Sequence, residues 1–469
     1  MGCCRGGGAM GDGGGAWDLK AAGPARARAA RAGPGELSGE ERRRAEARRL
    51  RRVLGAAVRP HRPPVLAFER WLARGKLGEG ADAGDALFPT GNGEEHEGLA
   101  RDLQRAGCTR EAAEAAADRL AQEAAAAAVA VREAAAEGVR RWGSAEEEEA
   151  QVRVRPGRGF FDFSLGEGGK NFLRVNAGHH AKLATLYRRF GPGRAEGEEG
   201  AGDRAARERR MRAAIYRLLS RYDSLSGPGY QAAVPAAAFC LARERLGVAL
   251  ECFASPLNSY FAHYCSAFPD TDSSFGSLGS FFDLERAEGS FEANPPFVPE
   301  VMDAMVDRME AMLGAASGAM SFLVVIPAWE ETRAFQRLAP EGSGEGRGMA
   351  AAQPLRRSVW LREAFVVGRE AHGFCDGAQH QRRERYRPAS FDSLVAVLQN
   401  DAGARKWPLG PGEAFRREFA GALAAAASGP SLEDWEAANA SGEKWRQGRQ
   451  RKRKREGDGH RRPPGSASS

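Results

Sequence analysis

The segment Asn294-Pro295-Pro296-Phe297 carries the clearest chemistry in this sequence. The two prolines fix φ and remove two backbone donors, so nearby carbonyl groups can face a pocket instead of pairing in a sheet. The Asn294 amide oxygen and the Pro295 carbonyl can then both accept from one exocyclic amine, while the Phe297 ring offers a face for stacking on a base. This favours an amino-methyltransferase. A plain turn is the alternative, because Asn and Pro are common turn residues.

The elements around this segment alternate in type. Apolar runs predict strands at Val248–Ala254, before Asn294, at Ser321–Pro327, Val359–Val367 and Ser393–Gln399, and an edge strand at Phe281–Leu284. We expect helices carrying Tyr260, Phe261, Tyr264 and Phe268, and carrying the methionine stripe Val301–Leu313. This alternation indicates an α/β domain whose ligands lie beyond the carboxyl ends of the strands. The turn after the first strand, Ser255–Asn258, lacks the Gly-rich dinucleotide pattern.

The preceding part of the chain reads as helical. Helices are expected at Ser38–Leu54, around Leu66–Leu72, and at Glu94–Arg141, 170–191, Arg204–Leu225 and 234–246, with a short strand or ordered loop at Val152–Phe163. We therefore divide the chain into a Gly/Ala/Arg-rich disordered region with a charged helix at 1–58, a helical domain at 59–246, an α/β domain at 247–412, and a helix with a basic disordered tail at 413–469.

One of these helices has a strongly basic side. Its arginines are Arg207, Arg209, Arg210, Arg212, Arg217 and Arg221. Fixed cations on one wall of a groove release counterions when a polyanion binds, so this side is a candidate phosphate contact. A solvated helix face is the alternative. The net charge of +7 favours an anionic partner, although the Arg, Ala and Gly enrichment weakens that argument.

Cysteine and hydropathy patterns exclude other classes of protein. The 7 cysteines form no C-x-x-C pair and have no histidine at zinc spacing, so we expect no metal site and a reducing compartment. No run of 18 apolar residues exists, which predicts no membrane span. The run Arg449–Arg455 is typical of a nuclear-localisation signal, and also of a generic RNA-binding or solvated tail.

Four segments carry a family resemblance: Glu251–Ser277, Gly289–Phe297 followed by Met302–Met305, Leu398–Asp401 and Lys406–Pro408. They closely resemble the phosphorylated-CTD-interacting factor family of cap-specific adenosine-N6 methyltransferases, with the likeness extending over about residues 170–410. The resemblance implies a Rossmann-like class I methyltransferase domain, preceded by an α-helical domain and flanked by disordered termini. It also implies S-adenosyl-L-methionine as cofactor, and capped mRNA whose first nucleotide is 2′-O-methyladenosine as substrate.

The resemblance further implies residue roles. Asn294, Pro295, Pro296 and Phe297 are the catalytic candidates, and the cofactor would be bound by Phe253, Ala254, Ser255, Pro256, Asn258, Asn294 and Phe297, with Asp270, Asp272 or Asp283 at its ribose. Substrate-binding candidates are Trp329, Glu330, His372, the Gly377–His380 segment, Arg217 and Arg221, with Trp329 stacking on 7-methylguanine or serving only as a rim tryptophan.

Two departures from the family pattern keep a second function open. Val298-Pro299-Glu300 stands where the family usually has two acidic residues, which puts a cap contact there in doubt. No pair of tryptophans marks a WW domain, so binding to the RNA polymerase II C-terminal domain is not evident. The alternative to an active enzyme is a catalytically inactive cap-binding or transcription adaptor that keeps the fold.

Overall fold

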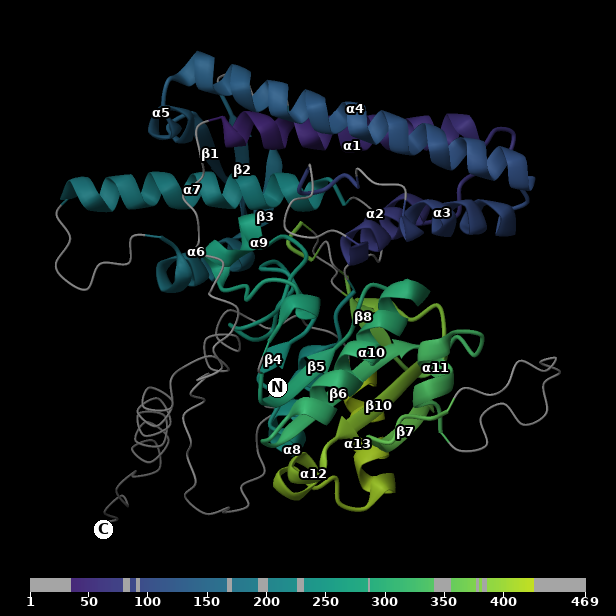
Figure 1. The fold of residues 1–469 in the computed structure, drawn as a ribbon. Coiled ribbons are helices and arrows are strands. Elements are labelled where there is room, and N and C mark those ends of the chain that lie inside the picture. Colours follow the sequence, from purple (N-terminus) through teal and green to yellow (C-terminus); the bar gives the residue numbers. More distant parts are fainter. Residues whose placement is uncertain are drawn as a thin grey trace, which may run out of the picture.

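The computed structural model describes residues 35–78, 85–89, 93–166, 171–192, 201–225, 232–285, 287–340, 356–376, 379–381 and 386–425. Long helices lie above a mixed sheet with its own flanking helices (Figure 1). The chain is mixed α/β in the described ranges, as the sequence predicts. The disorder expected at both ends and the basic run Arg449–Arg455 lie outside these ranges. None of the described helices is long and apolar enough to cross a membrane.

The N-terminal part combines helices with a small antiparallel sheet. Its elements are α1 (Glu36–Ala57), α2 (Ala67–Gly78), α3 (Glu94–Arg105), α4 (Arg110–Trp142), α5 (Ala145–Glu149), β1 (Val152–Gly157), β2 (Phe160–Leu165), β3 (Leu173–Asn176), α6 (Ala177–Phe190), α7 (Ala201–Asp223) and α8 (Ala236–Leu246). Helix α4 buries a stripe made mainly of alanine, which lets α1 pack closely along it.

Two sequence expectations for this part needed correction. Residues 170–191 are a strand followed by a helix, because Leu173 and Val175 alternate into the core before Asn176 caps α6 by accepting from the His179 N–H at 2.9 Å. Helix α1 begins at Glu36, before Ser38. The Ser38 hydroxyl does not cap it and instead donates to Glu148 Oε1 at 2.6 Å.

The C-terminal part is built on a sheet with strand order β4-β5-β6-β10-β7. Strands β4 (Leu250–Glu251), β5 (Gly289–Ala293) and β6 (Met320–Pro327) are parallel, and β10 (Ser393–Gln399) runs antiparallel to both β6 and β7 (Leu361–Val367). The remaining elements are α9 (Pro269–Asp272), η1 (Ser273–Phe275), η2 (Phe281–Asp283), α10 (Pro299–Ala315), α11 (Arg333–Leu338), η3 (Arg369–Ala371), β8 (Gly373–Cys375), β9 (Tyr386–Pro388), α12 (Asp401–Lys406) and α13 (Gly412–Ala424). This arrangement is consistent with a methyltransferase fold.

The segment after β4 differs from expectation. The first strand is only Leu250–Glu251, and Tyr260–Phe268 is not a helix. The Glu251 carboxylate accepts from the Tyr260 and Phe261 N–H groups at 2.8 Å each, so these amides are bonded outside a helix. The rings of Tyr260 and Phe261 belong to one core cluster and the ring of Phe268 belongs to another, so these side chains do not share one helix face. The expected edge strand Phe281–Leu284 is a 3-10 turn capped by Ser280.

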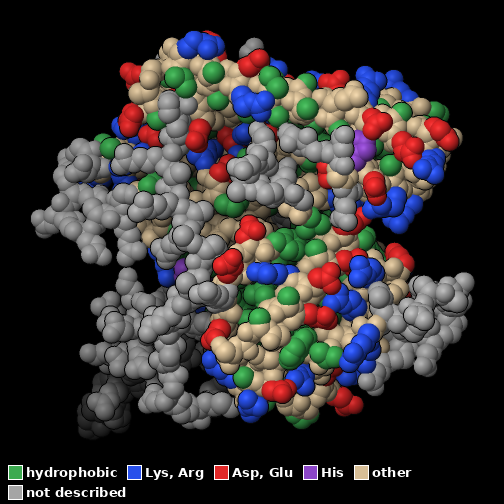
Figure 2. All heavy atoms as spheres, in the orientation of Figure 1, with side chains coloured by type: hydrophobic (Ala, Val, Ile, Leu, Met, Phe, Trp, Pro, Cys, Tyr) green, Lys and Arg blue, Asp and Glu red, His purple; other side chains and the backbone are tan. Residues whose placement is uncertain are grey.

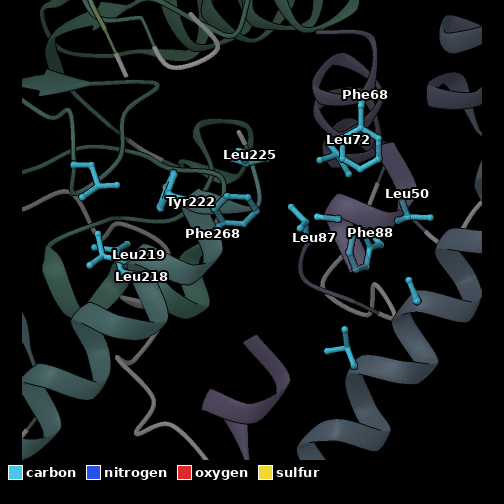
Figure 3. Packing of buried hydrophobic residues seen from close by; sticks show 14 of the residues in the cluster. Leu50, Phe68, Leu72, Leu87, Phe88, Leu218, Leu219, Tyr222, Leu225 and Phe268 are labelled. Atoms are coloured by element: carbon cyan, nitrogen blue, oxygen red, sulfur yellow. The ribbon is translucent and has the colours of Figure 1, made fainter. Parts of the chain in front are cut away.

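The loop that follows β4 contributes to the hydrophobic core of the helical part. The cluster that contains Leu50, Phe88 and Leu219 also includes Leu257 and Phe268 from the loop after β4. Figure 3 shows Phe268 beside Tyr222 at the end of α7, where the two ring centroids lie 5.5 Å apart. The two predicted domains are therefore joined by packing as well as by the chain.

Asp272 lies at this junction and is fully buried. It accepts from the Tyr222 hydroxyl at 2.6 Å and from the Thr271 hydroxyl at 2.8 Å. Burial raises the pKa of Asp272 to about 7, and these hydrogen bonds offset only part of that rise. The folded protein thus keeps a proton that the unfolded chain releases near pH 4, so stability falls as the pH rises between these values.

We predict that Asp272→Asn removes this dependence. Between pH 5 and pH 7 the free energy of unfolding of the wild type should fall by about 2 kcal/mol more than that of the variant. Urea denaturation at the two pH values measures the difference. Asp401→Asn, at a side chain 80% exposed, serves as the control and should follow the wild type. Parallel pH profiles for the wild type and Asp272→Asn would contradict the assignment.

Candidate functional site

Asn294 follows the last residue of β5, in the middle of the parallel part of the sheet. Its Nδ2 donates to the Ala232 carbonyl at 3.0 Å, which fixes the orientation of the amide. Its Oδ1 is buried and has no hydrogen-bond partner among the described residues. A buried acceptor without a donor is costly, so this atom is suited to receive a ligand N–H.

Two more polar side chains lie on the same face of β5. Ser290, Glu292 and Asn294 alternate with Phe291 and Ala293, which face α10 in the core. Within the described part of the chain, Ser290 Oγ and Glu292 Oε1 are also buried without hydrogen-bond partners. The buried face of β5 therefore carries a row of unsatisfied polar atoms that ends at Asn294.

Buried charges surround this row. Glu251 on β4 lies in register with Glu292 on β5. Burial raises the pKa of Glu251 to about 7, and burial together with the Glu251 charge raises the pKa of Glu292 well above its usual value. Burial lowers the pKa of Lys182, on α6, to about 7, and its ammonium donates to the Ser259 carbonyl at 2.6 Å. Burial thus favours the neutral form of the Glu292 carboxyl group.

Aromatic rings line the approach to Phe297. Its ring centroid lies 5.2 Å from that of Phe391 and 5.8 Å from that of Phe374, and the Trp329 centroid lies 6.1 Å from Phe391. Phe297, Phe391 and Trp329 are half-buried. The structure thus brings Trp329 and the motif into one aromatic cluster, which has the surface needed for stacking on planar bases.

The turn after β4 is held by its own side chains. Asn258 Oδ1 accepts from the Ser255 N–H at 2.7 Å and from the Ser255 hydroxyl at 2.9 Å. Ser255 and Pro256 are buried, whereas Phe253, Ala254 and Asn258 are half-buried. The Phe253 ring packs on Phe281 at 5.2 Å between centroids. Within this turn, Phe253, Ala254 and Asn258 therefore keep part of their surface open.

Other predicted residues are placed elsewhere. Arg221 is 1% exposed and is paired with Glu40 and with Asp270, to which it donates at 2.7 and 3.1 Å. Arg217 is paired with Glu36 and the Asp270 carbonyl. The open phosphate-binding face expected for this helix therefore does not include Arg217 and Arg221, because internal acceptors occupy both guanidinium groups. The Asp270 carboxylate likewise accepts hydrogen bonds from Arg221. Burial alone would raise the pKa of Asp270, but the charges of Arg221 and Arg217 hold that pKa below its usual range.

The remaining candidates also differ in accessibility. His372 is buried, with Nδ1 2.9 Å from the Gly368 carbonyl and Nε2 2.8 Å from the Ser393 hydroxyl, so both ring nitrogens have internal partners. The Asp272 carboxyl group accepts hydrogen bonds from the Tyr222 and Thr271 hydroxyls. Asp283 and Glu330 are exposed. Gly377 and Ala378 lie outside the described residues. In the described ranges, no group of three His, Cys, Asp or Glu residues is placed to hold a metal ion.

Comparison with known proteins supports the family resemblance. The sequence model described as "Phosphorylated CTD interacting factor 1 WW domain" matches residues 182–342, which include the motif. Two proteins named mRNA (2'-O-methyladenosine-N(6)-)-methyltransferase, from Homo sapiens and Mus musculus, are each 36% identical over 245 residues, or 50% of this chain. The chain spans about a third of their length (31%). The resemblance to this family is confirmed.

The matched range does not look like the short module that its description names. It holds a single tryptophan, Trp329, and its described residues include long helices and three strands of the parallel part of the sheet. The family match therefore falls on the predicted methyltransferase domain and the end of the helical part. It contains Asn294 and Glu292, but α2 and α3 lie before it.

Several residues of the site were not singled out by sequence reasoning. The alternation Ser290-x-Glu292-x-Asn294 along a strand is a signal that could have placed Glu292 beside Asn294. The Ala232 carbonyl and the Phe374 and Phe391 rings come from distant segments and carry no local signal.

Glu300 belongs to the segment Val298-Pro299-Glu300, whose departure from the family pattern put a cap contact in doubt, and it holds two parts of the fold together. It accepts from Arg74 on α2 and from Arg101 on α3, both at 2.9 Å, and Arg74 also donates to Asp102 at 3.0 Å. Burial alone would raise the pKa of Glu300, but these arginines hold it below its usual value. The first turn of α10, directly after the motif, is thereby fixed to the helical part.

We predict that Glu300→Gln destabilises the protein by roughly 2 kcal/mol, because Arg74 is 2% exposed and loses a charged partner. Glu97→Gln is the matched control, since Glu97 is also paired with Arg101 but is 77% exposed. Its effect should stay below about 0.5 kcal/mol. Chemical denaturation of both variants at neutral pH provides the measurement, and equal effects would show that the Glu300 contact is no stronger than a surface pair.

Proposed function

We propose that this chain transfers a methyl group from S-adenosyl-L-methionine to N6 of a cap-adjacent 2′-O-methyladenosine in mRNA. Asn294 Oδ1 has no hydrogen-bond partner among the residues that the structure describes, and this observation carries the proposal, because a target amine would supply the missing donor. The names of the human and mouse relatives support the reaction and the substrate. The residues around the turn after β4 and the motif fit the position that a cofactor occupies beyond the carboxyl ends of parallel strands.

In this mechanism the protein mainly positions the amine. Asn294 Oδ1 accepts one N–H of the target group, and the Pro295 carbonyl can accept the other, so that the nitrogen lone pair points away from both acceptors. Phe297 stacks on the adenine, and Phe391 and Phe374 hold the Phe297 ring in place. S-adenosyl-L-methionine supplies a methyl group bonded to a positively charged sulfur, which keeps the electrons of that bond when the nitrogen forms the new one. The amine then loses its extra proton to solvent.

The raised pKa of Glu292 suits this chemistry, because burial and the Glu251 charge favour its neutral form. In that form the carboxyl group adds no negative charge to the buried row next to Asn294. It can also donate a hydrogen bond, which a carboxylate cannot. Glu292 would therefore help to organise the row without taking the proton that the amine releases.

The first test is methyl transfer by Asn294→Ala. With capped RNA that begins with 2′-O-methyladenosine and a labelled cofactor, we expect a loss of at least about 100-fold in kcat, because the amine loses its fixed acceptor. RNA affinity should remain within about twofold. Glu97→Gln, far from the motif in sequence and highly exposed, should transfer at the wild-type rate.

The outcomes separate the proposal from its alternative. Absence of transfer by wild-type protein that still binds capped RNA would favour an inactive adaptor. Near-normal turnover by Asn294→Ala would show that the amine is held elsewhere. Equal methylation of capped and uncapped RNA would contradict the cap dependence.

A second prediction concerns Trp329, which we propose stacks on the 7-methylguanine of the cap. Trp329→Ala should raise KM for capped RNA roughly tenfold and leave kcat nearly unchanged, because stacking on a base is worth about 1–3 kcal/mol. Trp360→Ala is the control, since Trp360 packs against the same core cluster at the edge strand. If both variants have the same KM, or if Trp329→Ala affects capped and uncapped RNA alike, Trp329 does not read the cap.

A further inference from the structure

The small sheet β1-β2-β3 has one buried face and one exposed face. Its strands are antiparallel, and the alternating residues Val152, Phe163, Leu173 and Val175 enter the core against α6 and α7. The side chains between them must point to the opposite side. The outer sheet face is defined here as the side chains on that side, with Arg158 in the β1–β2 turn. Of these, Arg153, Arg155, Arg158 and Phe172 are exposed, and Phe160 and Arg174 are half-buried.

The outer sheet face is basic. Arg155, Asp162 and Arg174 form one cross-strand row, in which Arg174 binds Asp162 through two hydrogen bonds of 2.8 and 3.0 Å. Arg153, Arg155 and Arg158 are exposed. Asp162 thus offsets Arg174, and the other three arginines leave the face with a positive charge. By contrast, the side of the molecule in Figure 2 intersperses Lys and Arg with Asp and Glu.

Two aromatic rings accompany these charges. The Arg174 guanidinium carbon lies 3.9 Å from the centroid of Phe160 and 5.2 Å from that of Phe172. Phe172 is 50% exposed. A single exposed Phe is ordinary, but aromatic rings flanked by arginines on an open sheet combine base stacking with phosphate contacts.

The outer sheet face is connected to the motif through the protein. At the end of β3, the Asn176 N–H donates to the His380 carbonyl at 2.7 Å, and Asn176 Nδ2 donates to the Gln379 carbonyl at 3.0 Å. These acceptors follow β8, whose Phe374 ring contacts Phe297. These contacts place the end of β3 beside the segment that follows β8, whose Phe374 packs on the motif.

We propose that the outer sheet face binds the single-stranded RNA that follows the first nucleotides of the substrate. The choice of RNA rests on the proposed function, and the arrangement of charge and aromatic rings is independent of it. The occupant must be a flexible polyanion with unpaired bases, because the arginines suit phosphates and the phenylalanines suit exposed base faces. The expected contribution is to affinity for long RNA, with no role in the methyl-transfer step.

The test compares binding of capped RNAs of 3 and 20 nucleotides by fluorescence anisotropy. Arg153→Ala/Arg155→Ala should weaken binding of the long RNA roughly tenfold and lower the slope of log Kd against log salt by about 1.4, the value for two lost phosphate contacts. Phe172→Ala should weaken it about fivefold or more with little change in that slope. Binding of the 3-nucleotide RNA should not change. Arg110→Ala/Arg140→Ala on α4, where both side chains are exposed, is the charge-matched control and should bind like the wild type.

The outcomes distinguish this proposal from the proposed function. The outer sheet face does not bind RNA if Arg153→Ala/Arg155→Ala and Phe172→Ala bind the long RNA like the wild type. The same conclusion follows if these variants lose as much affinity for the short RNA as for the long one, whatever the methyl-transfer activity. If the variants lose long-RNA binding while the wild type shows no transfer, this proposal stands and the catalytic one fails. If the same variants lose binding of a serine-phosphorylated peptide but bind the long RNA like the wild type, the RNA assignment is wrong.

Discussion

The hydrogen bond to the Ala232 carbonyl keeps the side-chain amide of Asn294 from rotating by 180°, and the rest of the site depends on that constraint. The Ala232 carbonyl accepts from Nδ2, so the reverse orientation would bring two acceptors together. The acceptor Oδ1 is therefore held in a buried position before any ligand arrives. The sheet supports this arrangement because β5 lies between β4 and β6, and the prolines that follow end its pairing at the motif. An acceptor held in this way needs no further ordering when a ligand donor binds it.

The sequence predicted those parts that have a strong local pattern. The motif after a strand, the buried strand Ser321–Pro327 and the strand Ser393–Gln399 were expected because their apolar runs are long and their ends are marked. The stripe of Met302, Met305 and Met309 was read as core and packs against β5. These features follow from periodicity, which needs no knowledge of distant contacts.

The errors occurred where distant residues decide the local structure. Tyr260–Phe268 has enough apolar residues for a helix, but Glu251 accepts two of its amides and its rings enter separate clusters. Arg217 and Arg221 have the spacing of a solvent-facing stripe, but Glu36, Glu40 and Asp270 surround them. The acidic partners of Arg217 and Arg221 are at least 49 residues away, so the pattern of the helix alone could not reveal that the two arginines are paired internally.

The shared core has a consequence for how this protein can change over generations. Leu257 and Phe268 belong to the same cluster as residues of α1, α4 and α7, and Arg74 of α2 holds Glu300 beside the motif. The five-stranded sheet is therefore not a portable module that recombination could join to another N-terminal region without loss. A substitution in α2 alters the support of a motif that is distant in sequence, so we expect the effects of substitutions in the two regions to be coupled.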